Sequence, residues 1–142
     1  MLENSSAFNP NCTACPRLSE SLVKIRSKFS HYHARPVASF GAKNPKLLIV
    51  GLAPGLHGAN ATGRPFTGDH AGVILYKMLY EHGFSNKGIS RHLKDGMKLK
   101  HCQITNAVKC LPPENKPTSE EITRCNSYLV EELKSIDKKA VI

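Results

Sequence analysis

The sequence predicts an α/β fold with a parallel sheet, contained in a single domain. Short aliphatic runs typical of strands alternate along the chain with segments whose apolar residues recur at helical spacing. This alternation is typical of parallel sheets with crossover helices. The chain has 142 residues, of which 40% are hydrophobic and 22% charged. That length and that composition are those of one globular domain.

The first part of the chain is expected to hold one helix and one strand. Residues 16–29 begin with a proline, which the first turn of a helix tolerates. Their apolar side chains recur at helical spacing and are Leu18, Leu22, Ile25 and Phe29. A polar linker follows over residues 30–45. Residues 46–51, KLLIVG, are predicted to form a strand buried on both faces.

A glycine-rich loop, GLAPGLHGANATGRPFTGD, follows this strand over residues 51–69. Asp69 is expected to cap a helix beginning at His70 and stopping at Gly83. The side chains expected together on one side of this helix are Val73, Ile74, Met78 and Leu79. A polar loop over residues 84–100 then leads to a second strand over residues 101–108.

Three prolines exclude regular structure from residues 109–117, because proline fixes the backbone and lacks an N–H. A capping box of Thr118 and Glu121 predicts the start of another helix. Its apolar stripe comprises Ile122, Cys125, Leu129 and Leu133. The last residues, KKAVI, are typical of the first half of a third strand, so we expect a fold that is incomplete at its C-terminus.

The chain is strongly basic, with 20 Lys and Arg against 11 Asp and Glu and a net charge of +9. This excess favours a polyanionic partner, and a solubilising surface is the alternative interpretation. Candidate phosphate contacts are Arg64, Lys109 and Lys116. No apolar run is long enough for a bilayer and the N-terminal residues show no secretory signal. We therefore expect a cytoplasmic protein without a membrane partner.

The five cysteines indicate a metal site rather than disulfides, because their number is odd and no export signal is present. Cys12 and Cys15 form a C-x2-C pair, whereas 14 residues separate Cys110 from Cys125. Zinc sites usually repeat a short spacing in both halves, which the gap of 14 residues fits poorly, and four thiolates also suit an iron-sulfur cluster. Zinc and unligated thiols remain alternatives. Cys102 lies within an apolar run and is expected to be a buried free thiol.

The glycine-rich loop is expected to bind a flat polar ligand, because ligands of open α/β sheets bind beyond the carboxyl ends of the strands. It has neither the Walker pattern nor the dinucleotide fingerprint. Phe66, its one aromatic residue, is either a stacking platform or a plug beneath the loop. His57 and Asn60 are further candidates for ligand contacts.

Three stretches together carry a resemblance to a known family: CTACP, GLAPGLHGANATGRPFTGD and ITNAVKCLPPENKPT. They resemble the iron-sulfur branch of the uracil-DNA glycosylase superfamily, and within it family 5, also called type B. The resemblance covers the chain from Cys12 to about Leu133 and implies a three-layer α/β/α fold with a central parallel sheet. Residues 1–142 would then be the N-terminal portion of a single such domain.

The resemblance also implies an activity: extrusion of uracil, or of other deaminated bases, from DNA and hydrolysis of the N-glycosidic bond. The substrate would be double- or single-stranded DNA containing uracil, and the enzyme a monomer. A four-iron four-sulfur cluster would be held by Cys12, Cys15, Cys110 and Cys125.

The same resemblance assigns roles to individual residues. Phe66 would stack on the base, and the Asn106 amide would recognise its Watson–Crick edge. Further contacts with the base would come from Gly51, Ala53, Pro54 and Gly55. Asp69 and Asn106 are the candidate catalytic residues, with Asp69 orienting water or stabilising the sugar cation. Their alternative roles are a helix cap for Asp69 and the closure of a turn for Asn106.

Two features depart from the wider superfamily. Leu52 stands where related families carry a polar residue, a loss that family 5 shares, and it cannot activate water. A second motif of the His-Pro-Ser type is absent after Thr118. We therefore expect weak or absent activity from these 142 residues alone. A DNA-binding module with a cluster but impaired chemistry, and a metal-stabilised interaction protein, remain alternative interpretations.

Overall fold

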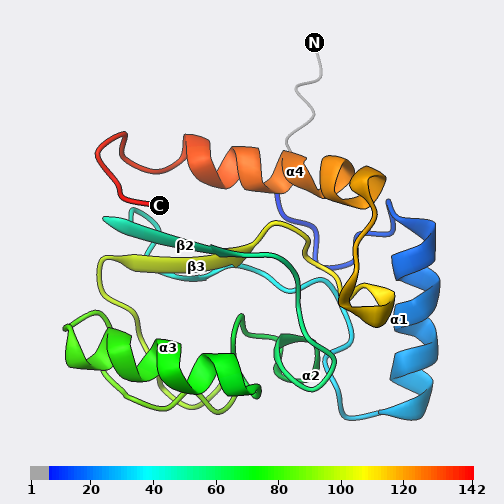
Figure 1. Cartoon of the computed structure of the whole chain (residues 1–142), viewed down its shortest axis with the longest axis horizontal. Coiled ribbons are helices and arrows are strands. Elements are labelled where there is room, and N and C mark those ends of the chain that lie inside the picture. The colour runs from blue at the N-terminus through cyan, green and yellow to red at the C-terminus, as the bar shows by residue number, and fades with distance from the viewer. Residues whose placement is uncertain (1–6) are drawn as a thin grey trace.

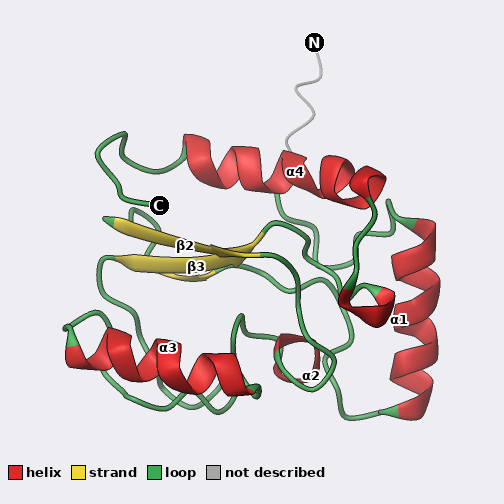
Figure 2. Ribbon diagram, viewed as in Figure 1, coloured by secondary structure: helices red, strands yellow, loops and turns green. Residues whose placement is uncertain are grey.

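The computed structural model describes residues 7–142, and it confirms the α/β class. The strands are β1 (Phe40–Gly41), β2 (Leu47–Gly51) and β3 (Cys102–Asn106). The helices are α1 (Pro16–Lys28), α2 (Ala59–Thr62), α3 (His70–Glu81) and α4 (Ser119–Lys134), and a 3-10 turn, η1, spans Pro113–Asn115. Figure 1 shows their arrangement. The sheet lies between α4 on one face and α3 on the other, with α1 at one end (Figure 2).

The sheet has the order β1-β3-β2. Its two longer strands are parallel, as predicted, with a register that runs from Leu47 opposite Cys102 to Gly51 opposite Asn106. β1 is antiparallel to β3 and falls in the stretch predicted to be a linker, so the sheet is mixed. β1 has only two residues, and one of them, Gly41, has a φ of 122°. So short a strand cannot show the alternation of apolar and polar residues by which strands are predicted from a sequence.

The C-terminal residues lie along the free edge of β2. Val141 forms a parallel bridge with Leu47. The N–H of Leu48 donates to the carbonyl of Val141 at 2.8 Å, and the N–H of Val141 donates to the carbonyl of Lys46 at 2.9 Å. The predicted third strand is therefore represented here by a single bridge in the expected parallel direction.

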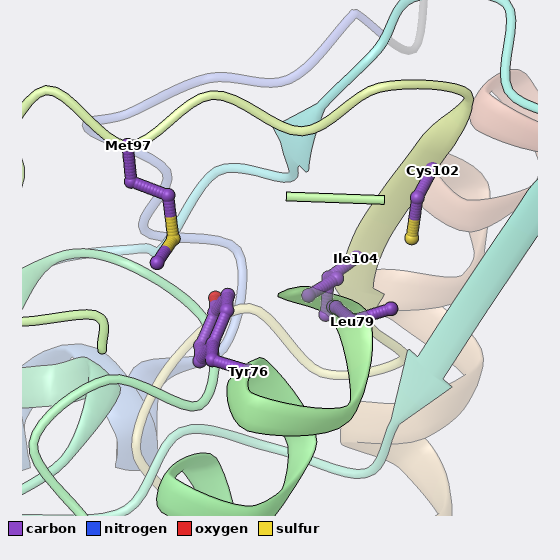
Figure 3. Packing of buried hydrophobic residues seen from close by; sticks show 5 residues of the cluster. All are labelled: Tyr76, Leu79, Met97, Cys102 and Ile104. Atoms are coloured by element: carbon purple, nitrogen blue, oxygen red, sulfur yellow. The ribbon is translucent and has the colours of Figure 1, made fainter. Parts of the chain in front are cut away.

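The main core fills the space between the sheet and α3. Figure 3 shows its five fully buried members, which are Tyr76, Leu79, Met97, Cys102 and Ile104. Cys102 is a free thiol with no exposed surface, as predicted. Burial raises its pKa to about 11, so it stays protonated at neutral pH and behaves as a small apolar side chain.

Of the four side chains predicted to share one side of α3, Leu79 is buried and the other three are exposed. Val73 and Ile74 are 63% and 60% exposed, and Met78 is also exposed. Gly72 faces inward instead, because a Cβ on this residue would lie 1.6 Å from the carbonyl oxygen of Phe66. This close backbone approach sets the rotation of the helix and brings Tyr76 inward with Leu79.

The helix starts follow the predicted capping residues. Asp69 caps α3, and the Thr118–Glu121 capping box of α4 is complete in both directions. Arg17 donates from Nε to Glu121 at 3.2 Å, which joins α1 to the start of α4. The apolar stripe of α4 is only partly covered, since Ile122 and Leu133 remain exposed.

Two short elements interrupt segments that were predicted to be irregular. They are α2 within the glycine-rich loop and η1 within the proline-rich stretch. Both have four residues or fewer, too short for a periodic pattern to show. Within residues 7–142, none of the helices combines the length and the apolar character that a membrane span needs.

Candidate functional site

The candidate site lies where the two parallel strands end. Gly51 and Asn106 are paired in the last position of the register. Pairing continues beyond the strands, because the N–H groups of Ala107 and Val108 donate to the carbonyls of Gly51 and Leu52 at 2.9 Å. The two segments that follow the strands therefore leave the same edge of the sheet side by side, as expected for a ligand site in a parallel sheet.

Gly51, Phe66 and Asn106 converge at this edge. A Cβ on Gly51 would lie 2.4 Å from Oδ1 of Asn106 and 2.7 Å from Cζ of Phe66. Real Cβ atoms do not approach other atoms so closely, so only glycine fits here. The absence of a side chain at Gly51 lets an amide and an aromatic ring lie against the same stretch of backbone.

The Asn106 side chain is available to a ligand. The residue is buried at the end of β3. No hydrogen bond made among residues 7–142 involves its side-chain amide. A primary amide offers both donors and an acceptor, and the Asn106 amide atoms are not among the fully buried polar atoms that lack a partner. The pocket edge is therefore suited to a ligand that presents an acceptor next to a donor.

Phe66 is held in an unusual backbone conformation, with a φ of 53° in the left-handed region. Its ring packs partly against the main core and partly lines a groove of about 500 Å³. The ring is therefore in part a plug beneath the loop, and its role as a stacking platform stays a prediction. Gly72, to which the sequence assigned no role, supports this conformation through the close approach of its backbone to the Phe66 carbonyl. The sequence did offer one sign of this role, because a glycine within an apolar helical run often marks a close packing contact.

Asp69 has one oxygen committed to the helix and one turned to the loop. Its Oδ1 accepts from the N–H of Gly72 at 3.1 Å, which is the predicted cap. A Cβ on Gly58 would lie 2.4 Å from Oδ2, and one on Gly55 would lie 3.6 Å from it. The half-buried carboxylate therefore caps α3 and also faces the glycine-rich loop, where Gly58 has no room for a side chain.

The segment after β2 contributes backbone groups. Pro54 has no N–H, so only Ala53 and Gly55 can donate from this segment. Neither N–H is used in a hydrogen bond among the described residues. Ala53 and Gly55 are both half-buried. These two donors remain available beside the Gly51 position.

A buried ion pair underneath the loop corrects the role predicted for Arg64. Its side chain is 2% exposed and donates from Nη1 to both carboxylate oxygens of Asp95 at 3.0 Å. Arg64 therefore cannot reach a phosphate. The same Nη1 donates to Ser90 at 3.0 Å, and Thr67 shares a 2.6 Å hydrogen bond with Ser90. These contacts join residues 64–67 of the glycine-rich loop to the segment that follows α3.

Burial alone would raise the pKa of Asp95. The N–H groups of Arg91 and Met97 and the Arg64 guanidinium outweigh it, so this pKa lies well below its usual range. Asp95 is therefore ionised across the neutral range. The sequence carried no signal for the pair, because 31 residues separate Arg64 from Asp95.

Lys109 is likewise structural. Its side chain is 1% exposed and donates to Glu132 at 3.0 Å and to Thr105. It joins the end of β3 to α4 and cannot contact DNA, which corrects its prediction as a phosphate contact. Lys116 is exposed, and its predicted role stays a prediction.

The two polar loop candidates differ in exposure. His57 is exposed and pairs through Nδ1 with the hydroxyl of Tyr32 at 2.7 Å. Asn60 is fully buried in α2, where its Nδ2 donates to the carbonyl of Leu56 at 3.3 Å. Asn60 therefore shapes the loop from within, and its side chain does not reach its surface.

The four predicted metal ligands come together around one cavity. Cys12 and Cys15 precede α1, Cys110 follows β3, and Cys125 lies in α4. All four are free thiols, and they line a cavity of about 80 Å³. Among residues 7–142, no three Cys, His, Asp or Glu side chains have the arrangement that holds a single metal ion.

The thiols influence one another electrostatically. Burial, and then the charges of the other three cysteines, raises the pKa of Cys110 to about 12. Burial also raises the pKa values of Cys15 and Cys125. The N–H of Lys109 donates to Sγ of Cys125 at 3.2 Å. As thiolates, which are the ligating form of cysteine, these side chains would carry negative charges that repel one another and would form a donor set for a cationic group.

Comparison with known proteins gives a consistent result. Residues 38–142 match the family model described as the uracil DNA glycosylase superfamily. The chain is 45% identical over 136 residues to a type-5 uracil-DNA glycosylase of Pyrobaculum aerophilum, covering 93% of the chain and 60% of that protein. It is 46% identical over 127 residues to a type-5 uracil-DNA glycosylase of Thermus thermophilus, covering 86% of the chain and 58% of that protein.

A more distant relative is a type-4 uracil-DNA glycosylase of Archaeoglobus fulgidus. It is 33% identical over 107 residues, which cover 75% of the chain and 46% of that protein. The chain thus spans 60% or less of the length of these three relatives.

Proposed function

Since this chain belongs to the uracil-DNA glycosylase superfamily and groups with its type-5 members, we propose that it serves DNA repair by excising uracil. The reaction is hydrolysis of the N-glycosidic bond after the nucleotide is extruded from the helix. The observation that carries this proposal is the convergence of Phe66 and the free Asn106 amide over Gly51. The ring offers a stacking surface, and the amide offers a donor and an acceptor to the edge of a pyrimidine.

The proposed mechanism places charge at two points. As the bond breaks, the sugar becomes cation-like and the uracil becomes anion-like. Asn106 and the N–H groups of Ala53 and Gly55 would donate to the leaving base. The free oxygen of Asp69 faces the loop that would surround the sugar, where a carboxylate can stabilise the cation or orient water. Leu52, which is exposed beside Gly51, contributes no proton transfer.

We propose that the cysteine-lined cavity holds a four-iron four-sulfur cluster. A single zinc ion would draw four sulfur atoms to about 2.3 Å from itself, which leaves no room for a cavity of about 80 Å³. Four thiolates are the usual ligands of this cluster. When bound, the cluster would supply a structural brace joining α1, α4 and the segment after β3, which begins next to Asn106.

The excision activity can be tested with single-turnover assays on duplex and single-stranded DNA carrying one uracil. With enzyme in large excess, we expect alkali-labile sites to appear slowly with the wild-type chain, in line with the weak activity expected of these 142 residues. Gly51→Ala should reduce the rate by at least about a hundredfold, because the added methyl displaces Phe66 and Asn106. Gly83→Asn is the matched control, since no atom lies within 4 Å of its added Cβ and asparagine tolerates a positive φ.

Two results would contradict the excision proposal. Equal excision rates for the Gly51 and Gly83 variants would show that the site around Gly51 takes no part in the reaction. Selective binding of uracil-containing DNA without excision would favour a DNA-binding module with impaired chemistry.

The cluster can be tested by purifying the protein without oxygen. We expect about four iron and four sulfide ions per chain and a broad absorption near 400 nm. Cys110→Ser should lose most of the iron and absorption, whereas Cys102→Ala should keep both, because Cys102 lies in the main core. Zinc in place of iron, or equal iron content in the two variants, would refute this assignment.

A further inference from the structure

Residues 84–100 form an irregular hairpin, here called the basic hairpin, that carries a large share of the positive charge. A bridge between Ser85 and Leu99 closes its base, and the N–H of Asn86 donates to Lys98 at 3.2 Å. Its Lys and Arg side chains all belong to exposed residues, which are Lys87, Arg91, Lys94, Lys98 and Lys100. Its single carboxylate, Asp95, is 6% exposed and is neutralised by Arg64. The hairpin therefore presents cations to solvent without an exposed acid of its own.

Two hollows lie on the two sides of Ile89. The outer hollow, of about 420 Å³, is lined among others by Tyr80, Asn86, Lys87 and Arg91. The inner groove, of about 500 Å³, extends from Ile89 to Phe66 and Asp69. Ile89 lines both and is 62% exposed. A hollow lined by two cations thus adjoins the groove leading to the candidate base pocket, and the exposed Ile89 side chain borders both.

The basic hairpin has a fixed position relative to the pocket. Ser90, next to Ile89, is hydrogen-bonded to Thr67 and to Arg64. Arg64 also donates from Nη2 to the carbonyl of Leu93 at 3.4 Å. Figure 1 shows this segment running alongside α3 on the face of the sheet opposite α4. A nucleic-acid strand bound to the hairpin would therefore lie at a fixed position relative to Phe66 and Asp69.

We propose that the basic hairpin is the binding surface for the DNA strand that carries the extruded nucleotide. Lys87 and Arg91 would contact phosphates in the outer hollow. Ile89 would lie against the base adjacent to the extruded one, at the entrance of the inner groove. This inference rests on the proposed function for the identity of the extruded nucleotide, and on charge complementarity for the polyanionic partner.

The chemistry of the outer hollow suits a phosphodiester. Lys87 donates to the carbonyl oxygen of Asp95, which orients its ammonium group along the hairpin and uses one of its three donors. Arg91 uses its backbone N–H to bind the Asp95 carboxylate at 2.8 Å, which leaves its guanidinium outside that contact. Both cations thus have donors left for phosphate oxygens.

The test measures equilibrium binding of the full chain to a labelled duplex with one uracil, between about 50 and 200 mM salt. The variant Lys87→Gln/Arg91→Gln is expected to make the slope of log K against log salt shallower by about two, one for each cation that no longer neutralises a phosphate. The control Lys138→Gln/Lys139→Gln removes the same charge from exposed residues near the C-terminus and should keep the wild-type slope. Ile89→Ser should weaken binding on the order of tenfold with an unchanged slope.

The outcomes separate this inference from the proposed function. Equal slopes for the hairpin variant and the wild type, or an equal change of slope in the control, would overturn the hairpin surface even if uracil is excised. A shallower slope in the hairpin variant alone would support the surface even if the wild type shows no preference for uracil. A wild-type chain whose DNA binding has no salt dependence would overturn it.

Discussion

Asp95→Asn is expected to lower the free energy of unfolding by about 3–5 kcal/mol, because it leaves the Arg64 guanidinium buried without its counterion. Arg64 is 2% exposed, so water cannot replace the missing carboxylate. Cation-π contact with the Phe40 ring, 4.2 Å from the guanidinium carbon, is too weak to compensate. Denaturant titration followed by circular dichroism measures the effect.

A matched control is Glu131→Gln, which breaks the exposed pair between Glu131 and Lys134. Exposed pairs contribute at most about 1 kcal/mol, so this variant should stay close to the wild type. Comparable losses of stability in the two variants would show that the buried pair contributes no more to the free energy of unfolding than the exposed pair does.

The effect of Asp95→Asn should also depend on pH in a defined direction. The pKa of Asp95 is lowered by folding, so its ionised form contributes stability above the unfolded-state pKa of about 3.9. That contribution is lost as the pH falls from this value through the still lower pKa of the folded state. The difference between wild type and variant should therefore be constant from about pH 5 to 7 and shrink below about pH 4.

Asn106→Leu is expected to lower the rate of uracil excision by about a hundredfold to a thousandfold, the usual cost of removing one donor to a developing anion. Leucine has the same branching and the same number of heavy side-chain atoms as asparagine but cannot donate to the leaving base. Asn106→Asp should be at least as damaging, because a carboxylate would face that base with a negative charge. Single-turnover rates at saturating enzyme separate this loss of rate from weaker binding.

The control for this prediction is Asn126→Asp on the exposed face of α4. Thermal melting should show that Asn106→Leu stays folded, since the amide it removes makes no hydrogen bond among residues 7–142. Retention of the wild-type rate within about threefold would remove Asn106 from the reaction.

Much of the local structure was predictable because it depends on near neighbours in the chain. The Thr118–Glu121 capping box and the Asp69 cap involve residues three positions apart. The run from Leu47 to Gly51 showed the aliphatic pattern of a buried parallel strand. The glycine-rich loop was recognisable as a candidate ligand-binding segment from its composition and from its place directly after a predicted strand.

The face of α3 could not be predicted from apolar periodicity. Val73 and Ile74 are as apolar as the residues that became buried, so the pattern favoured them. The rotation was decided by the contact between Gly72 and the Phe66 carbonyl, which depends on a loop conformation with a positive φ. The roles of Arg64 and Lys109 were missed for a similar reason. A basic side chain in a sequence gives no sign of the carboxylate that it will meet in the fold.

The sequence by itself determined the α/β class, the helix caps, the cysteine set and the glycine loop, because each follows from residue types at short or characteristic spacing. Only the tertiary structure decided which cations are exposed and which are buried in ion pairs. It also placed Phe66 and Asn106 together over Gly51, although 40 positions separate these two residues in the chain. The physical reason is that burial and pairing depend on contacts between distant segments, which exist only after the chain has folded.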